Sequence, residues 1–440
     1  MAAPMEALND VASELRRAGA ARLWGEVDGL AGPMVRIAGL KGFAAIGDRV
    51  EIARAGGALA GEIIALEGDR AVAMALGRPE GVALGARTDL SDVPPAKPSI
   101  GWLGCVVDAY GEIRKGDGLA GDRPADLFAA PPGAALRRGF GARLDTGSAA
   151  FDTVLPLCAG QRVGLFAGAG VGKSSLIGRF AQGMAVDVVV VGLIGERGRE
   201  VARFVSETVG PEAMKRCVVV ASTSDEPAPD KLRAARLAMA TAERFRDEGR
   251  RVLLLMDSLT RFAEAHREVA LAAGETPSLR AFPPSTAAEL ARLVERAGPG
   301  AGAGGDITAI FSVLVAGSDM DEPVADMVRG LLDGHVVLSR EIAERGRFPA
   351  IDLVRSVSRS LPEAASADEN VLIGAARSLI AKYEQIAPMV QAGLYAPGAD
   401  PLADRAIAVF DQLDAFLAEN SPGAARAFER LALILNPQSE

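Results

Sequence analysis

One stretch of the chain has the residue types and spacing of a phosphate-binding loop. The segment GLFAGAGVGKSSL covers residues 164–176, and its glycines precede Lys173 and Ser174. Glycine-rich backbone lets several N–H groups converge on a β-phosphate, while the lysine reaches the β- and γ-phosphates and the serine ligates Mg²⁺. Ala167 stands where the motif usually has its first glycine. The motif predicts a nucleotide-binding site, contacted by Gly168, Ala169, Gly170, Val171, Gly172, Lys173, Ser174 and Ser175.

A second candidate is the aspartate that ends the apolar run RVLLLMD. Asp257 is the last residue of that run and lies about eighty residues after the loop. If the run is a strand of the same sheet, its carboxyl end lies beside the phosphate loop, where an aspartate can hold Mg²⁺ directly or through water. Many strands end in aspartate for other reasons, so the assignment depends on the loop.

A third candidate is the acidic pair in GLIGERGRE, directly after the run VDVVVV. Glu196 at that strand end could orient and polarise the attacking water. Glu200, one helical turn further on, could support the waters around the metal. The alternative is that both residues simply stabilise the N-terminus of a helix.

The elements that must position these residues follow an alternating strand and helix pattern. Helix-like segments near 173–183, 198–209, 230–248 and 259–271 lie between several continuous apolar runs. This pattern indicates an α/β fold with a mostly parallel sheet covered by helices on both faces. The predicted strands are QRVGLF, VDVVVVGLIG, CVVVAS, RVLLLMD, DITAIFSVLV and HVVLS. We interpret GPGAGAGG, residues 298–305, as a flexible surface loop.

The segments on either side of this core have different patterns. Short alternating strands separated by glycines, from Trp24 to about Asp92, predict a small β-barrel or sandwich, and DVPPAKPS reads as a linker. After RSLPEAAS, apolar residues recur at helical spacing to the end of the chain. The predicted domains are a β-barrel over 21–95, a P-loop domain over 96–360 and a helical domain over 361–440.

Residues 1–20 carry Leu8, Val11 and Leu15 at helical spacing and read as an amphipathic arm. The arm either folds back on its own domain or binds a partner. It lacks the apolar core of a secretory signal. The three cysteines form no CxxC pair, so we expect a cytoplasmic protein with neither disulfide framework nor zinc site.

Composition bears on the class of ligand. The net charge is −9, and only 5% of residues are aromatic. Both features disfavour a dedicated nucleic-acid binder, because phosphate contacts need clustered cations and base stacking needs aromatic rings. We therefore expect no specific nucleic-acid partner.

The motifs together resemble the ATPases of flagellar and other type III protein export, which are similar to the catalytic subunit of rotary ATP synthases. The resemblance covers nearly the whole chain and is carried by GLFAGAGVGKSSL, GERGRE, LLLMDSLTRFAEAHRE, DEPVADMVRGLLDGHVVLSR and FPAIDLVRSVSR. It implies a β-barrel, a RecA-like P-loop ATPase domain and a C-terminal helical domain. It also implies a ring, expected to be a hexamer.

The resemblance assigns further roles to matching residues. Glu196 matches the family's catalytic glutamate, and Arg197 follows it near the γ-phosphate. Arg359, the last residue of SVSR, matches an arginine finger that reaches the neighbouring protomer's site. Phe348 lies where relatives place a tyrosine against the adenine, unless it is a simple core aromatic. Tyr395 is expected to help close the adenine pocket.

The same resemblance implies a role in flagellar or type III protein export. The expected partners are further copies of the chain, a stator-like regulator bound by the N-terminal arm, export chaperones with their substrates, and a membrane export gate. The expected location is peripheral to the membrane export apparatus. The alternatives are a non-flagellar type III secretion ATPase, an RNA translocase, a non-catalytic ring subunit and a rotary ATPase subunit.

Overall fold

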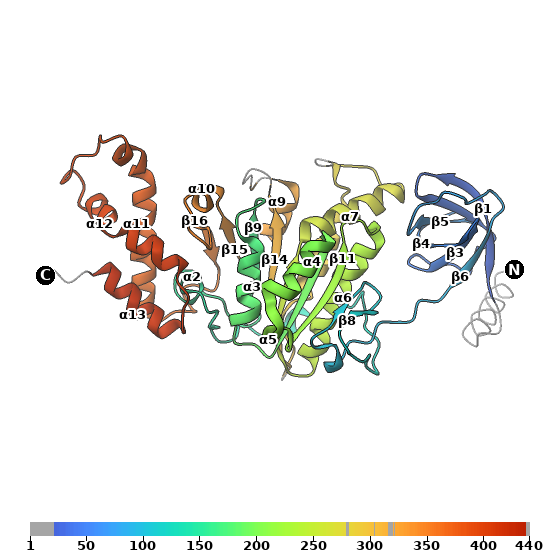
Figure 1. Ribbon diagram of the computed structural model, residues 1–440, viewed down its shortest axis with the longest axis horizontal. Helices are drawn as coiled ribbons and strands as arrows, with labels where there is room; N and C mark the ends of the chain where they lie inside the picture. Colours follow the sequence, from blue (N-terminus) through green and yellow to red (C-terminus); the bar gives the residue numbers. More distant parts are fainter. Residues whose placement is uncertain (1–21, 279–280, 303, 316–319, 321, 437–440) are drawn as a thin grey trace.

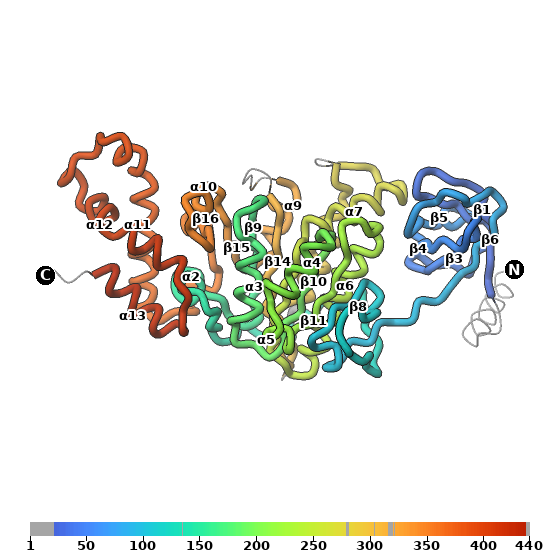
Figure 2. Tube along the Cα trace, in the orientation of Figure 1, coloured from blue at the N-terminus to red at the C-terminus, as the bar shows by residue number. Residues whose placement is uncertain are grey.

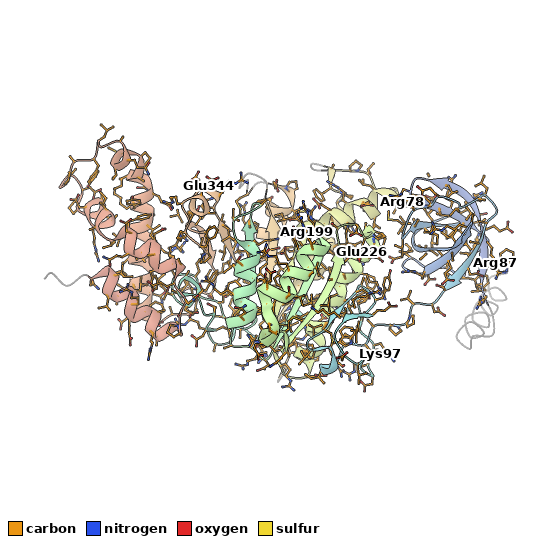
Figure 3. The ribbon with its side chains drawn as sticks, viewed as in Figure 1. Arg78, Arg87, Lys97, Arg199, Glu226 and Glu344 are labelled. Atoms are coloured by element: carbon orange, nitrogen blue, oxygen red, sulfur yellow. The ribbon has the colours of Figure 1, made fainter. Side chains whose placement is uncertain are left out.

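The computed structural model describes residues 22–278, 281–302, 304–315, 320 and 322–436. Figure 1 shows three parts along the long axis: a β-barrel near the N-terminus, a central sheet with helices, and a group of helices near the C-terminus. The arm predicted over residues 1–20 lies outside the described residues. In Figure 3, Arg78 and Arg87 mark the barrel and Lys97 marks the chain that leaves it.

The N-terminal part is a closed antiparallel barrel. Its strand order is β1-β2-β5-β4-β3-β6. Alternate side chains such as Val35, Ile37, Val50 and Ile52 are fully buried inside it, as the period of two in a strand requires. The prediction of a small all-β domain is confirmed, and closure removes exposed sheet edges. The strands are β1 (Trp24–Ala31), β2 (Met34–Ala38), β3 (Arg49–Arg54), β4 (Gly57–Glu67), β5 (Arg70–Ala75) and β6 (Arg87–Ser91).

The barrel joins the central part through a single extended segment, visible in Figure 2. Polar contacts fix the two parts together. Arg49 of β3 donates a hydrogen bond to the Tyr110 hydroxyl, which donates to Asp230 in the central part. Ile64 and Met74 of the barrel also belong to the apolar core of the central part.

The central part is a ten-stranded sheet. Its order is β16-β15-β9-β14-β12-β10-β11-β7-β8, with β13 paired to β14. The pairs from β15 to β7 are parallel, whereas β16, β8 and β13 join antiparallel. The strands are β7 (Val106–Val107), β8 (Ile113–Lys115), β9 (Arg162–Ala167), β10 (Val188–Glu196), β11 (Cys217–Thr223), β12 (Arg251–Asp257), β13 (Gly298–Pro299), β14 (Asp306–Leu314), β15 (Gly334–Leu338) and β16 (Ile351–Ser358).

The α/β fold class is confirmed, and the six apolar runs form β9, β10, β11, β12, β14 and β15. Helices cover the sheet as the pattern predicts (Figure 1). The segment expected as one helix over 198–209 is an α-helix followed by a π-helix. The elements are η1 (Ile100–Trp102), η2 (Ala134–Leu136), α2 (Ala149–Asp152), α3 (Lys173–Gly183), α4 (Gly198–Arg203), η3 (the π-helix, Phe204–Val209), α5 (Gly210–Met214), α6 (Ala228–Asp247), α7 (Leu259–Ala272), α8 (Ser285–Glu295), α9 (Pro323–Arg329) and α10 (Arg340–Glu344).

The prediction of a loop over 298–305 is wrong at its first two residues, and backbone further along the segment is held by a side chain from elsewhere in the chain. Gly298 and Pro299 form β13 and pair with β14. The Arg138 side chain donates hydrogen bonds to the carbonyl oxygens of Gly300 and Gly304, at 3.0 and 2.8 Å. Arg138, which is distant in the sequence, therefore stabilises a segment that its glycine-rich composition alone predicts to be flexible.

The C-terminal part consists of α11 (Ala367–Gln391), α12 (Pro401–Ala418) and α13 (Ala424–Leu435). A capping box between Ser366 and Glu369 begins α11. Tyr383 of α11 and Phe410 of α12 stack with ring centroids 3.6 Å apart. Among the described residues, we find no helix with the length and apolarity to cross a membrane.

Candidate active site

The candidate residues meet at the carboxyl edge of the parallel strands. The phosphate loop follows β9, whereas Glu196 ends β10 and Asp257 ends β12. Parallel pairing aligns these ends, with Leu193 of β10 opposite Asp257. Arg199 and Glu226, labelled in Figure 3, mark the same edge beyond β10 and β11. Ligands of open α/β sheets bind at this edge, outside the carboxyl ends of the strands.

The loop from Gly168 to Gly172 has a backbone that favours glycine at two points. Gly170 and Gly172 have φ angles of +78° and +87°. A Cβ added to Gly172 would lie 2.9 Å from the Phe348 ring, so glycine also allows this ring to approach the loop. Phe348 is 47% exposed, so one part of its ring remains open beside the loop. It is therefore not a simple core aromatic.

Lys173 and Asp257 form an ion pair inside the site. The lysine ammonium donates to the Asp257 carboxylate, which also accepts a 2.6 Å hydrogen bond from the Ser312 hydroxyl. Lys173 Nζ lies 3.9 Å from Glu196 Oε1. The structure thus brings together three of the predicted residues. For Lys173 to bind phosphate as predicted, its ammonium would exchange this carboxylate partner for phosphate oxygens.

Sequence reasoning missed Ser312. It is a fully buried hydroxyl in the largely apolar strand β14, which lies between β9 and β12. A polar residue inside a buried strand must find a hydrogen-bond partner, so the serine in DITAIFSVLV was a signal. Its partner became visible only with the strand order.

Glu196 has the electrostatics expected of a proton acceptor. Burial, followed by the negative charge of Asp257, raises its pKa from 4.5 to about 7, although the Lys173 ammonium acts in the opposite direction. A hydrogen bond with Glu200 also raises the pKa. A carboxylate with a pKa near the working pH is suited to general-base chemistry.

This pKa predicts how the empty protein responds to pH. Because the folded pKa exceeds the unfolded value, the stabilisation is fully present below about pH 4.5 and is lost as pH rises through about 7. We expect Glu196→Gln to stabilise the nucleotide-free chain at about pH 8 and to lose that advantage near pH 4.5. Denaturation midpoints of the two chains at both pH values measure it, and an advantage independent of pH would contradict it.

Two of the predicted site residues lie at the solvent side of the cleft. Arg197 and Glu200 are 66% and 49% exposed, with Arg197 Nε 3.9 Å from Glu200 Oε1. Glu200 faces Glu196 closely enough to affect its pKa. Arg197 has no comparable contact with the buried cluster among the described residues. Their roles toward metal and phosphate remain predictions.

Arg359 lies far from the phosphate loop of its own chain. It follows β16, whose Ser358 pairs with Gly334, whereas Leu338 at the other end of β15 lies beside Ala167. The four-residue separation along β15 spans about 13 Å. Arg359 is exposed, and its guanidinium donates to the Leu332 carbonyl at 3.0 Å. The fold therefore places it away from its own site.

Tyr395 makes its polar contacts within the C-terminal part. It lies in the connection between α11 and α12, and its hydroxyl donates to Asp404 of α12 at 2.8 Å. No contact between Tyr395 and the phosphate loop is present among the described residues. Its role at an adenine pocket remains a prediction.

The chain is similar to known ATPases along most of its length. Residues 147–358 match the nucleotide-binding domain of the ATP synthase alpha/beta family, and residues 365–429 match the C-terminal domain of the type III secretion ATPase EscN. The chain is 43% identical to the flagellum-specific ATP synthase of Caulobacter vibrioides, over 91% of this chain and 93% of that protein. The chain belongs to the ATP synthase alpha/beta family.

Within this family, similarity extends to both flagellar and secretion ATPases. The type 3 secretion system ATPase of Xanthomonas euvesicatoria is 42% identical, with 92% of each chain covered. The assembled ATPase EscN of enteropathogenic E. coli superposes with a TM-score of 0.85 at 34% identity, covering 93% of this chain and all of that one. A second EscN structure, in complex with its central stalk EscO, gives a TM-score of 0.82 at 35% identity. The predicted resemblance is confirmed.

Proposed function

We propose that this chain is a Mg²⁺-dependent ring ATPase that supports flagellar or type III protein export. The observation that carries the hydrolytic part is the partly buried Glu196 beside Lys173, with its raised pKa. Steady-state phosphate release from ATP by the purified chain, with and without Mg²⁺, tests this activity. No release in the presence of Mg²⁺ would contradict it.

The residues present fit a magnesium ion. Ser174 at the start of α3 and Asp257 offer hard oxygen ligands, and Asp257 is nearly fully buried. Mg²⁺ keeps several waters and needs only one or two protein carboxylates beside substrate phosphates. No group of three or more His, Cys, Asp or Glu side chains forms a metal cage within the described part of the chain. When bound, the ion would neutralise charge on the β- and γ-phosphates.

The mechanism assigns a task to each side chain. The backbone N–H groups of residues 168–172 and the Lys173 ammonium hold the phosphates. The Glu196 carboxylate orients a water molecule in line with the γ-phosphate and accepts a proton from it. Phe348 offers an aromatic face beside the loop for the adenine ring.

A ring completes the site. Arg359 lies at the opposite end of the strands from the phosphate loop of its own chain. We therefore propose that its guanidinium acts at a neighbouring protomer's site. There, its guanidinium would stabilise charge on the phosphoryl group in the transition state. The fold similarity to assembled EscN supports a homo-oligomeric arrangement, for which we propose a hexamer.

The export role rests on the relatives. Curated relatives include flagellum-specific ATP synthases and type 3 secretion system ATPases at similar identity, so a flagellar system and a virulence system are both candidates. We propose that ATP turnover helps deliver and unfold chaperone-bound export substrates at a membrane gate. The EscN complex with its stalk protein supports a protein partner for the ring.

Affinity capture of the full chain from its own cells tests the export role. We expect flagellar or secretion components, and the set recovered identifies the system. Deleting residues 1–18 should weaken capture of a stator-like regulator, because this segment carries the amphipathic pattern suited to partner binding. ATP hydrolysis by the purified deletion variant should persist. Unchanged capture by that variant would remove the proposed docking role of the arm.

A further inference from the structure

A cavity of about 700 Å³ extends from the catalytic carboxylates along one side of α3. Its walls come from α3, from α4 with the following π-helix, and from the link between α12 and α13. Ser174, Glu196 and Asp257 line it at the proposed site of hydrolysis, and Arg179 and Gln182 line it further along α3. The cavity thus runs from the proposed site of hydrolysis to Arg179 and Gln182, two side chains that have no role in the proposed mechanism.

Arg179 is a cation without a partner in this cavity. Arg203, the other arginine among the lining residues, is paired with Glu207 at 2.9 Å between Nε and Oε2. Lys173 of the phosphate loop is paired with Asp257. Arg179 makes no hydrogen bond or ion pair with the described part of the chain, and its Nη1 is enclosed without any acceptor. A buried charged donor without an acceptor is costly, and it calls for a bound anion or water.

The wall that carries Arg179 is rigid and aligned with the phosphate loop. Ser175 and Arg179 lie one helical turn apart on one face of α3, about 6 Å along its axis. A Cβ on Gly178 would lie 2.2 Å from the Thr208 side chain, so α3 and the π-helix are in close contact there. Gln182 donates to the Thr208 carbonyl at 2.8 Å, which fixes the same contact.

We propose that Arg179 forms a binding site for inorganic phosphate on the route by which this product leaves the catalytic site. The proposal rests on the proposed ATPase function, since hydrolysis generates the anion within the same cavity. A guanidinium binds phosphate oxygens through two parallel N–H donors. Among the described residues that line the cavity, Arg179 is the arginine whose guanidinium is not already paired with a carboxylate. Glu196, Glu200 and Glu207 also line the cavity, and their charge favours weak, transient binding over trapping.

Equilibrium binding of radiolabelled phosphate to the full chain tests this site. A non-hydrolysable ATP analogue fills the phosphate loop, so that remaining binding reports on the cavity. We expect Arg179→Gln to weaken phosphate binding by at least about tenfold, since a charge-assisted contact is lost. The control Arg203→Gln removes a cation from the same cavity that already has a partner, and it should retain binding. Arg179→Lys keeps the charge and serves as the second variant if the glutamine variant does not fold, with partial binding expected.

The outcomes separate this site from the activity. Phosphate should inhibit ATP turnover less in Arg179→Gln than in the unaltered chain, with the KM for ATP retained. Absence of phosphate binding beside the analogue, or equal binding by all variants, overturns the site. A change in nucleotide affinity without a change in phosphate binding also overturns it, since Arg179 would then contact the nucleotide. Failure of the unaltered chain to hydrolyse ATP would instead contradict the proposed function.

Discussion

Replacing Glu196 with glutamine should lower kcat for ATP hydrolysis by about 10²- to 10⁴-fold, the usual contribution of a general base. Glutamine keeps the size and hydrogen-bonding reach of the side chain but cannot accept the proton of the attacking water. Lys173 and the backbone of the loop are unchanged, so nucleotide affinity should remain. Phosphate release and binding of a fluorescent nucleotide measure the two quantities separately.

The matched control for this variant is Glu200→Gln. Glu200 is half-exposed and follows Glu196 by one turn, so its replacement removes a nearby carboxylate without removing the proposed base. We expect a much smaller loss of kcat in the control. Full activity of Glu196→Gln, or equal losses in both variants, would sink the assignment of the base.

Replacing Arg359 with alanine should lower turnover by about 10³- to 10⁵-fold while leaving nucleotide binding intact. The reason is geometric: Arg359 lies about 13 Å or more along the strands from the phosphate loop of its own chain, so the proposed role places it at another protomer's site. Arg359→Lys should also be impaired, since an ammonium lacks the guanidinium fork. Arg345→Ala, at an exposed arginine elsewhere in the same domain, provides the control.

Mixing two inactive variants distinguishes action in trans from action within one chain. In a ring assembled from equal amounts of Glu196→Gln and Arg359→Ala chains, an interface with both residues intact arises at about one half times one half, or about a quarter, of positions. Partial recovery of turnover is therefore expected. No recovery from mixed rings that have demonstrably assembled would contradict a shared site.

Much of the site was predictable because its parts are local in the chain. The phosphate loop needs a strand, a glycine-rich turn and a helix in direct succession, and these occur in sequence between Arg162 and Gly183. Glu196 and Asp257 were identifiable because each ends a continuous apolar run, and parallel strands place such ends together. The pairing of Gly298 and Pro299 with β14, and the contacts of Arg138 with the loop that follows, were not predictable, because both depend on residues distant in the sequence.

The α/β class, the phosphate loop and the acidic strand ends can be predicted from the sequence, since each depends on hydrophobic periodicity or on residues adjacent in the chain. The electrostatics of the site follow only from the folded chain, because they depend on strand order. The order β9-β14-β12-β10 places Ser312 against Asp257, and Lys173 between two carboxylates. Burial then raises the Glu196 pKa. The same packing left Arg179 without a partner and placed Arg359 at the far end of the sheet, since charge pairing depends on distances that one-dimensional spacing does not contain.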